Sequence, residues 1–218
     1  MELKGRKVAF LGDSITEGVG VTNQNNRYDR RLADRYGLEA VNFGISGTRI
    51  AHQSIPSNPA RFDLCFCGRA FDLPKDADVI VVFGGTNDFG HGDAPFGEDA
   101  DRTPETYCGA VHYLMDVLKT NYPNAEIVFM TPARRQTDEI PPKHPYTREP
   151  KHVLIDYVDQ IVRTAGQYGI HVLDLYRELG INPNMEAERV RYAPDGLHLN
   201  DEGHAVLAEH LGALLEKL

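Results

Sequence analysis

A serine follows the first apolar segment of the chain, in the tripeptide Gly12, Asp13 and Ser14. A serine just beyond a buried strand and before a helix can hold its hydroxyl at the edge of a sheet, and its backbone N–H can point toward a bound oxygen. Such a hydroxyl is a weak nucleophile and needs a neighbouring base to remove its proton. The same tripeptide is also typical of a turn that caps a helix. Taken alone, it leaves both interpretations open.

An aspartate and a histidine lie close together near the carboxyl end of the chain, at Asp195 and His198. Neutral imidazole can take a serine proton near pH 7, and a carboxylate on the other ring nitrogen fixes the tautomer and orientation of the ring. Two residues in one loop can satisfy that need locally. Surface loops with merely solvated polar residues show the same spacing, so this pair also has two interpretations.

Two further positions could donate hydrogen bonds to a bound oxygen. Asn87 follows the most apolar strand candidate, and Gly47 follows another and offers a backbone N–H with no side chain in front of it. Together with the N–H of Ser14 they would form an oxyanion hole, in which one donor is typically worth about 3 kcal/mol of transition-state stabilisation. Alternatively, Asn87 forms an Asx turn and Gly47 occupies a positive φ.

Short apolar segments alternate with longer amphipathic segments along the chain. Strands are predicted over 8–11, 39–43, 78–83, 127–130 and 170–173. The segment 78–83 is apolar on both faces and β-branched, which is typical of a central strand of a parallel sheet. Helices are predicted over 27–36, 103–122, 150–169 and 200–218, with Thr103 and Pro104 beginning the second of them.

This alternation predicts one α/β domain over residues 1–218, with a parallel sheet and helices on both faces. Folds of this kind bind and react at the carboxyl ends of their strands. The four candidate site segments follow the first, second, third and last predicted strands, so all four should meet at that edge. Three long segments, 48–77, 88–102 and 131–149, also follow strands and predict an elaborated binding site there.

The composition excludes several classes of protein. Hydrophobic residues make up 41% of the 218 residues and charged residues 25%, which is typical of a packed globular chain. A formal net charge of -9 argues against nucleic-acid binding and, more weakly, against anionic membrane surfaces. Without a recognisable signal peptide or membrane-spanning segment, a cytoplasmic location is expected. Cys65, Cys67 and Cys108 match neither a disulfide framework nor a zinc motif, so no metal is expected.

Four segments, in order along the chain, resemble the SGNH (GDSL-type) hydrolase family. They are FLGDSIT at 10–16, NFGISG at 42–47, GTND at 85–88 and DGLH at 195–198. The sequence departs from the family pattern at Ile15, where the family name has leucine, a change that should not affect the chemistry.

The resemblance implies a flavodoxin-like three-layer α/β/α sandwich with a five-stranded parallel sheet and no cofactor. It also implies Ser14 as nucleophile, Asp195 and His198 as its acid–base partners, and Ser14 N–H, Gly47 and Asn87 as the oxyanion hole.

The expected activity is hydrolysis of small-acyl esters through an acyl-enzyme, by a short-chain esterase or a carbohydrate O-acetyl esterase. The polar long segments favour a hydrophilic substrate such as an acetylated sugar, with Asp13, His91 and Arg134 as candidate substrate contacts. A thioesterase or lysophospholipase of the same family, or a binding protein on this fold, are the alternatives. Aromatic residues in these segments could equally serve self-association, so a homo-oligomer stays open.

Overall fold

The computed structural model describes residues 2–142 and 152–218, and its centre is a five-stranded parallel sheet. The strands are β1 (Lys7–Gly12), β2 (Glu39–Gly44), β3 (Val79–Phe83), β4 (Glu126–Met130) and β5 (His171–Leu173). Their order across the sheet is β2-β1-β3-β4-β5. The chain therefore reverses its direction of winding between β1 and β3, which opens a crevice at the carboxyl ends of these two strands. The predicted α/β fold class is confirmed.

Side chains of each strand alternate between two hydrophobic clusters, one on each face of the sheet. In β1, Ala9 and Leu11 belong to one cluster, and Val8 and Phe10 belong to the other. Every residue of β3 is buried, as expected for a strand covered on both sides. The sheet therefore forms the middle layer of three.

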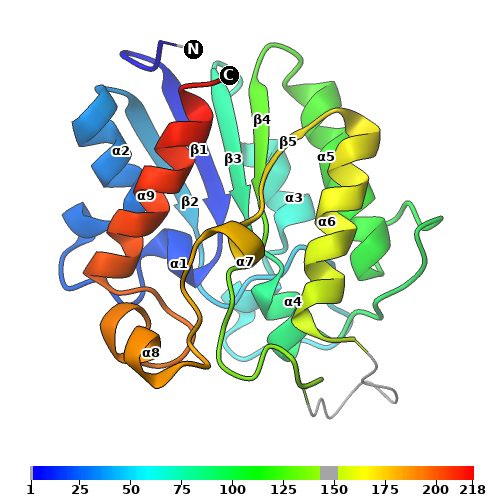
Figure 1. The fold of residues 1–218 in the computed structure, drawn as a ribbon. Coiled ribbons are helices and arrows are strands. Elements are labelled where there is room, and N and C mark those ends of the chain that lie inside the picture. Colours follow the sequence, from blue (N-terminus) through cyan, green and yellow to red (C-terminus); the bar gives the residue numbers. More distant parts are fainter. Residues whose placement is uncertain (1, 143–151) are drawn as a thin grey trace.

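Helices cover both faces of this sheet (Figure 1). One cluster is completed by α3 (Phe66–Arg69), α5 (Tyr107–Asn121) and α6 (Leu154–Tyr168). The opposite cluster is completed by α2 (Tyr28–Tyr36), α7 (Leu175–Glu178) and α9 (Asp201–Leu215). Helices α5 and α6 pack on each other, as do α2 and α9. These are the outer layers of an α/β/α sandwich.

Two predicted helix starts are wrong. Helix α5 begins at Tyr107, because Thr106 is the N-cap whose hydroxyl accepts from the backbone N–H of Gly109; Thr103 and Pro104 precede it. Helix α6 begins at Leu154, because Val153 is extended and donates its N–H to the Asp156 carboxylate. Residues 150 and 151 of that prediction lie outside the described residues.

Short helices occupy segments that the sequence pattern left irregular. The segment 48–77 contains η2 (Ala60–Asp63), α3 and η3 (Ala70–Asp72), and α4 (Thr86–His91) follows β3. Other short helices are α1 (Ser14–Glu17), η1 (Gln24–Asn26) and α8 (Glu186–Tyr192). They are too short to show an apolar period, so spacing could not predict them. Of the segment 131–149, residues 143–149 lie outside the described part.

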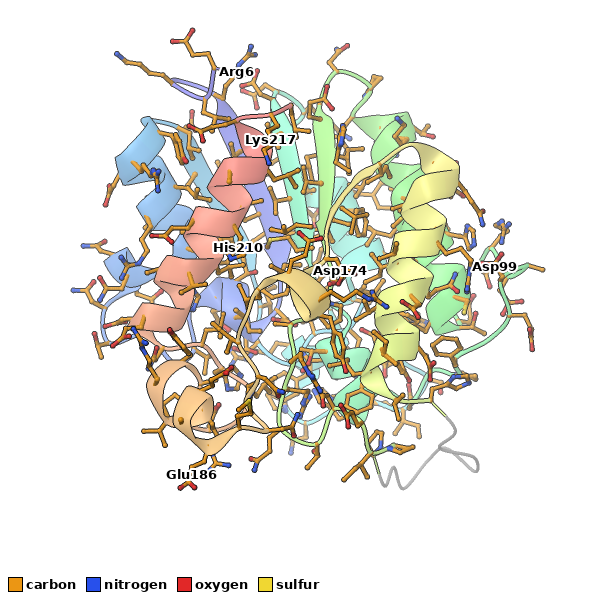
Figure 2. The ribbon with its side chains drawn as sticks, in the orientation of Figure 1. Arg6, Asp99, Asp174, Glu186, His210 and Lys217 are labelled. Carbon is orange, nitrogen blue, oxygen red and sulfur yellow. The ribbon has the colours of Figure 1, made fainter. Side chains whose placement is uncertain are left out.

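The two edges of the sheet differ in what surrounds them (Figure 1). The strands point toward the edge where α1, α4 and α8 lie, and both termini lie at the opposite edge. Figure 2 shows Glu186 of α8 at the first edge, and Arg6 and Lys217 at the second. Within the described residues, no helix has the length and apolarity needed to cross a membrane.

Candidate active site

Ser14, His198 and Asp195 form one hydrogen-bonded chain. Nε2 of His198 lies 2.9 Å from Oγ of Ser14, and Nδ1 of the same ring lies 2.6 Å from Oδ2 of Asp195. Ser14 is only 5% exposed, so the imidazole reaches a hydroxyl that is largely withdrawn from water. This is the arrangement of nucleophile, general base and orienting acid required for nucleophilic catalysis by serine.

The end of β1 and the start of α1 position the nucleophile. Asp13 caps α1 by accepting from the backbone N–H of Ile15 at 3.0 Å, so Ser14 is the first residue of the helix. Two residues further, the hydroxyl of Thr16 lies 2.9 Å from that of the fully buried Tyr28. This contact fixes α1 against α2, and with it the direction of the serine hydroxyl.

The loop before α9 holds the acid and the base by its own backbone. Oδ1 of Asp195 accepts from the backbone N–H groups of Leu197 at 2.9 Å and His198 at 2.7 Å, leaving Oδ2 for the imidazole. Partial burial works to raise the pKa of Asp195, but the hydrogen bonds from His198 and the two backbone groups outweigh it, and the pKa stays below its ordinary value. Asp195 therefore remains charged opposite the ring.

Backbone donors meet beside the serine. The N–H groups of Ser14 and Gly47 donate no hydrogen bond among the described residues, and both residues line one cavity. Gly47 has a φ of +76°, and a Cβ at this position would lie 2.6 Å from the ring of Phe62. Only glycine can bring its N–H to this place without displacing the aromatic ring.

The side chain of Asn87 is oriented by three neighbours. Its Nδ2 donates to the carbonyl of Thr48 at 3.0 Å and lies 3.4 Å from Oδ2 of Asp13, and its Oδ1 lies 3.1 Å from Nε2 of His91. A donor at His91 Nε2 selects the orientation with Oδ1 toward the imidazole and Nδ2 toward Asp13. Ser14, Gly47 and Asn87 all line the same cavity. The oxyanion hole expected from them stays a prediction.

Asp88 is a buried carboxylate to which sequence reasoning gave no role. It accepts from the backbone N–H groups of Ile50 and Ala51, each at 2.9 Å. Burial raises its pKa to about 6 against the opposing effect of these hydrogen bonds. Asp88 therefore fastens the segment after β2 to α4, and so holds Gly47 and Asn87 in one relative position.

Arg69 of α3 ties the carboxyl ends of β1 and β2 together, a role that no local signal could reveal. Its guanidinium donates to Leu64 O, Phe43 O, Gly12 O and Thr48 Oγ1 at 2.9, 2.6, 3.1 and 2.8 Å. Burial lowers its pKa to about 10, which leaves it charged at neutral pH. Two of its four acceptors, Gly12 and Thr48, are the sequence neighbours of Asp13 and Gly47.

The three predicted substrate contacts lie in different surroundings. Asp13 is 1% exposed and caps α1, with burial as the main cause of its pKa of about 6, so its position is structural. His91 lines the cavity beside Ser14. Arg134 is not brought there: its guanidinium binds Asp138 at 3.0 Å and Glu139 at 2.6 Å, and the next residue, Arg135, lines the cavity instead. The sequence does not indicate which of these two adjacent side chains points into the cavity.

A cavity of about 370 Å³ contains the serine and the histidine. It is also lined by Val19, Phe62, His91, Arg135 and Leu197. A second cavity of about 350 Å³ shares Phe62 and His91 with it and has Arg49, Ser57 and Asp93 in its wall. The first is the candidate substrate site, since it alone of the two reaches the nucleophile.

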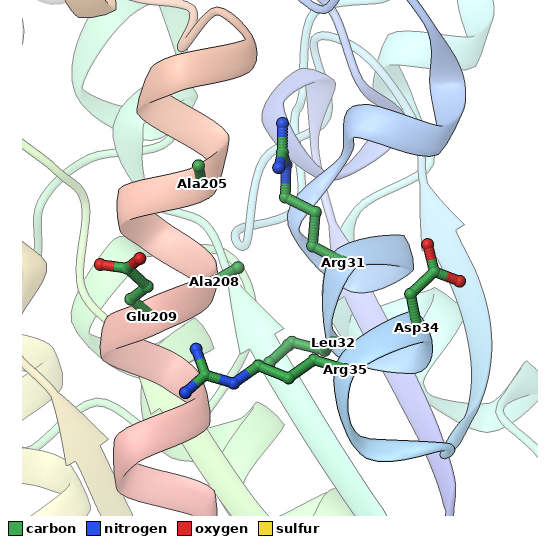
Figure 3. A pocket seen from close by; sticks show the side chains of 7 residues that line it. All are labelled: Arg31, Leu32, Asp34, Arg35, Ala205, Ala208 and Glu209. Atoms are coloured by element: carbon green, nitrogen blue, oxygen red, sulfur yellow. The ribbon is translucent and has the colours of Figure 1, made fainter.

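A groove of about 390 Å³ lies elsewhere, between α2 and α9. Figure 3 shows Arg31 and Arg35 extending from α2 toward α9, which presents Ala208 and Glu209. The residues that line this groove include no serine or cysteine beside a histidine. Cys65, Cys67 and Cys108 are free thiols, and no cluster among the described residues is suited to hold a metal ion.

Comparisons with known proteins identify the family and agree with the fold. A model of the GDSL-like lipase/acylhydrolase family matches residues 10–206. A solved structure from Lactobacillus plantarum is 32% identical, with a TM-score of 0.84 over 98% of each chain. A possible lipase from Chitinophaga pinensis is 22% identical (TM-score 0.66, 97% of this chain and 98% of that one). A member of the lipolytic G-D-S-L family from Veillonella parvula is 16% identical (TM-score 0.62, 98% of this chain and 100% of that one). The latter two support the fold alone. No curated protein sequence gives a significant match.

Proposed function

The chain belongs to the GDSL-like lipase/acylhydrolase family, and from this premise we propose that it is a serine esterase with Ser14 as its nucleophile. The observation that carries the proposal is the chain of hydrogen bonds from Ser14 through His198 to Asp195, at 2.9 and 2.6 Å. A protein that only binds esters has no need of a base placed on a buried serine hydroxyl. This favours an enzyme over a binding protein on the same fold.

In the acylation step, Oγ of Ser14 attacks the ester carbonyl and its proton passes to Nε2 of His198. The carboxylate of Asp195 stabilises the imidazolium. The carbonyl oxygen becomes an oxyanion, which the N–H groups of Ser14 and Gly47 and the amide of Asn87 stabilise. The C–O bond then breaks, and the leaving alcohol takes the proton from His198.

In the deacylation step, water takes the place of the alcohol. His198 removes a proton from the water as it attacks the acyl-serine, and the oxyanion forms at the same donors. The acid leaves as the proton returns to Ser14, so the enzyme is regenerated without any cofactor.

We infer that the acyl group is small and that the alcohol is hydrophilic, as in an acetylated sugar. A volume of about 370 Å³ is at the lower end of the range for small-molecule sites, and the adjoining cavity has Arg49, Ser57 and Asp93 in its wall. Thioesters and lysophospholipids are the competing substrates within the family. A long acyl chain would need apolar surface beyond Val19, Phe62 and Leu197.

The test is hydrolysis of p-nitrophenyl acetate, butyrate and octanoate, together with a panel of acetylated sugars. We expect kcat/KM to fall as the acyl chain lengthens and turnover to vanish in Ser14→Ala. Ser46→Ala is the matched control: it removes another serine hydroxyl from the cavity wall, but one that donates to Glu17, so turnover should persist. Octanoate hydrolysed faster than acetate would favour the lysophospholipase alternative.

A further inference from the structure

Arg135 places a positive charge in the wall of the cavity that contains Ser14 and His198. It lies shortly after β4 and is partly buried. Of the described residues that line this cavity, Arg135 is the only lysine or arginine. The proposed mechanism gives it no task, because the oxyanion has its donors from Ser14, Gly47 and Asn87.

The guanidinium of Arg135 is only partly satisfied by the protein. Nη1 lies 3.3 Å from both the carbonyl and the hydroxyl oxygen of Thr86. Within the described part of the chain, Nε is buried without an acceptor and Nη2 makes no hydrogen bond. Asp138, Asp13 and Asp195 act on its charge from a distance, but none forms an ion pair with it. Arg134, one residue earlier, binds two carboxylates.

Helix α4 is shaped to admit this guanidinium. A Cβ at Gly90 would lie 2.8 Å from Nη1 of Arg135, so any larger residue would push the guanidinium away. The guanidinium also lies over the ring of Phe89, 5.7 Å from its centroid. Thr86, Phe89 and Gly90 thus form a cradle that holds the charge at the cavity.

A partly buried cation without a carboxylate partner is costly, and burial lowers the pKa of Arg135 accordingly. An anion bound in the cavity would bring an opposite charge to the guanidinium and offset this cost. Guanidinium matches the planar geometry of a carboxylate, and its hydrogen bonds to charged acceptors are the stronger kind. One cation in the wall suits a singly charged carboxylate better than a doubly charged phosphate.

A substrate carboxylate bound by Arg135 would lie on the alcohol side of the ester. The backbone N–H of Gln136 donates to the carbonyl of Gly196 at 2.7 Å, so the segment that carries Arg135 lies against the loop that carries His198. In the proposed function, His198 Nε2 gives its proton to the leaving oxygen, so the alcohol part of the substrate faces this loop.

We propose that Arg135 binds a carboxylate on the alcohol part of the substrate, so that the enzyme prefers O-acylated hydroxy acids to neutral esters. This inference rests on the proposed function, since it names the substrate class of the same site. The hydrophilic alcohol expected above would then be an acid, such as a hydroxy acid or a sugar acid.

The test compares O-acetyllactate with O-acetyllactamide, which differ in charge but hardly in shape. We expect kcat/KM to be about tenfold or more in favour of the carboxylate, as for one hydrogen bond to a charged group. Arg135→Gln should abolish this ratio, and Arg135→Lys should restore part of it. Arg61→Gln is the matched control, because Arg61 is exposed near the cavity and lies 3.7 Å from Glu17; it should keep the ratio.

Equal kcat/KM for the lactate and lactamide esters in the wild type would overturn the inference. So would a loss of the ratio in Arg61→Gln as large as in Arg135→Gln, because it would indicate long-range attraction. A second pair, p-nitrophenyl hydrogen succinate and p-nitrophenyl butyrate, puts the charge on the acyl side; a preference confined to this pair would also contradict it. Ser14-dependent hydrolysis of neutral esters without any anionic preference would leave the proposed function standing and remove only this inference. Melting temperatures of all variants identify any that do not fold.

Discussion

The two edges of the sheet use charged residues in opposite ways. At the amino edge, Arg6 pairs with Asp78 at 2.7 Å and Lys7 with Asp76 at 2.5 Å, and the side chains of Arg6 and Asp76 are well exposed. At the carboxyl edge, Arg69 is 7% exposed and donates only to main-chain carbonyls and one threonine hydroxyl. Arg6 thus keeps its charge in water, whereas Arg69 is buried against the backbone.

This difference separates charges that contribute little to stability from charges that hold the site in place. Exposed ion pairs are screened by solvent and contribute little. Buried charged groups cost free energy unless each is satisfied, so they persist only where they hold something in place. At the carboxyl edge, Arg69 and Asp88 hold the segments that carry Ser14, Gly47 and Asn87. Substitutions at the carboxyl edge should therefore cost more than substitutions at the amino edge.

Loss of the base should have the largest effect. His198→Ala is expected to lower kcat on small esters on the order of 10⁶-fold, while Asp195→Asn, which leaves the base but spoils its tautomer, should cost on the order of 10⁴-fold. Steady-state kinetics with circular dichroism as a check of folding will measure this. Retention of a tenth of the wild-type kcat by His198→Ala would rule out the proposed base.

Removing one oxyanion donor should cost less. Asn87→Ala is expected to lower kcat roughly 10²- to 10³-fold with little change in KM, because the amide stabilises charge that develops only in the transition state. A change that appeared in KM alone would instead indicate that Asn87 binds the ground state of the substrate.

Arg69→Met at the carboxyl edge should lower stability far more than Arg6→Met at the amino edge. It leaves four acceptors at the carboxyl edge without their donor, and we expect the free energy of unfolding to fall by roughly 3 to 5 kcal/mol. Urea titration measures it. A loss below about 1 kcal/mol would mean that water replaces the guanidinium freely, and the contrast between the two edges would fail.

Arg6→Met makes the same substitution at the amino edge and should change stability by no more than about 0.5 kcal/mol. The backbone N–H of Lys7 and the Arg6 guanidinium lower the pKa of Asp78, so its contribution is present above the ordinary aspartate pKa and is lost as the pH falls through the lowered value. The small effect of Arg6→Met should therefore be seen at neutral pH and disappear in acid. Urea titrations at both pH values decide this.

The strands were predictable because their signals are local, whereas the candidate catalytic residues were indicated only by four separate segments taken together. An apolar β-branched segment predicts β3, and the position of each site segment after a strand predicts the common edge. Arg69 was not predictable, because its acceptor Gly12 lies 57 residues away and nothing near Arg69 in the sequence indicates it. The sequence named Arg134 as a candidate contact, but Arg135 lines the cavity, because the backbone direction after β4 decides which of two adjacent side chains enters it.

The central claim is that Ser14 attacks the ester, and covalent labelling tests it most directly. An alkyl p-nitrophenyl phosphonate transfers its phosphonyl group to an activated serine and releases p-nitrophenolate. We predict one label per chain, located by peptide mass spectrometry on Ser14, with labelling strongly slowed in His198→Ala. A label on any other residue, or full ester hydrolysis by a protein that resists labelling at Ser14, would contradict the assignment of the nucleophile.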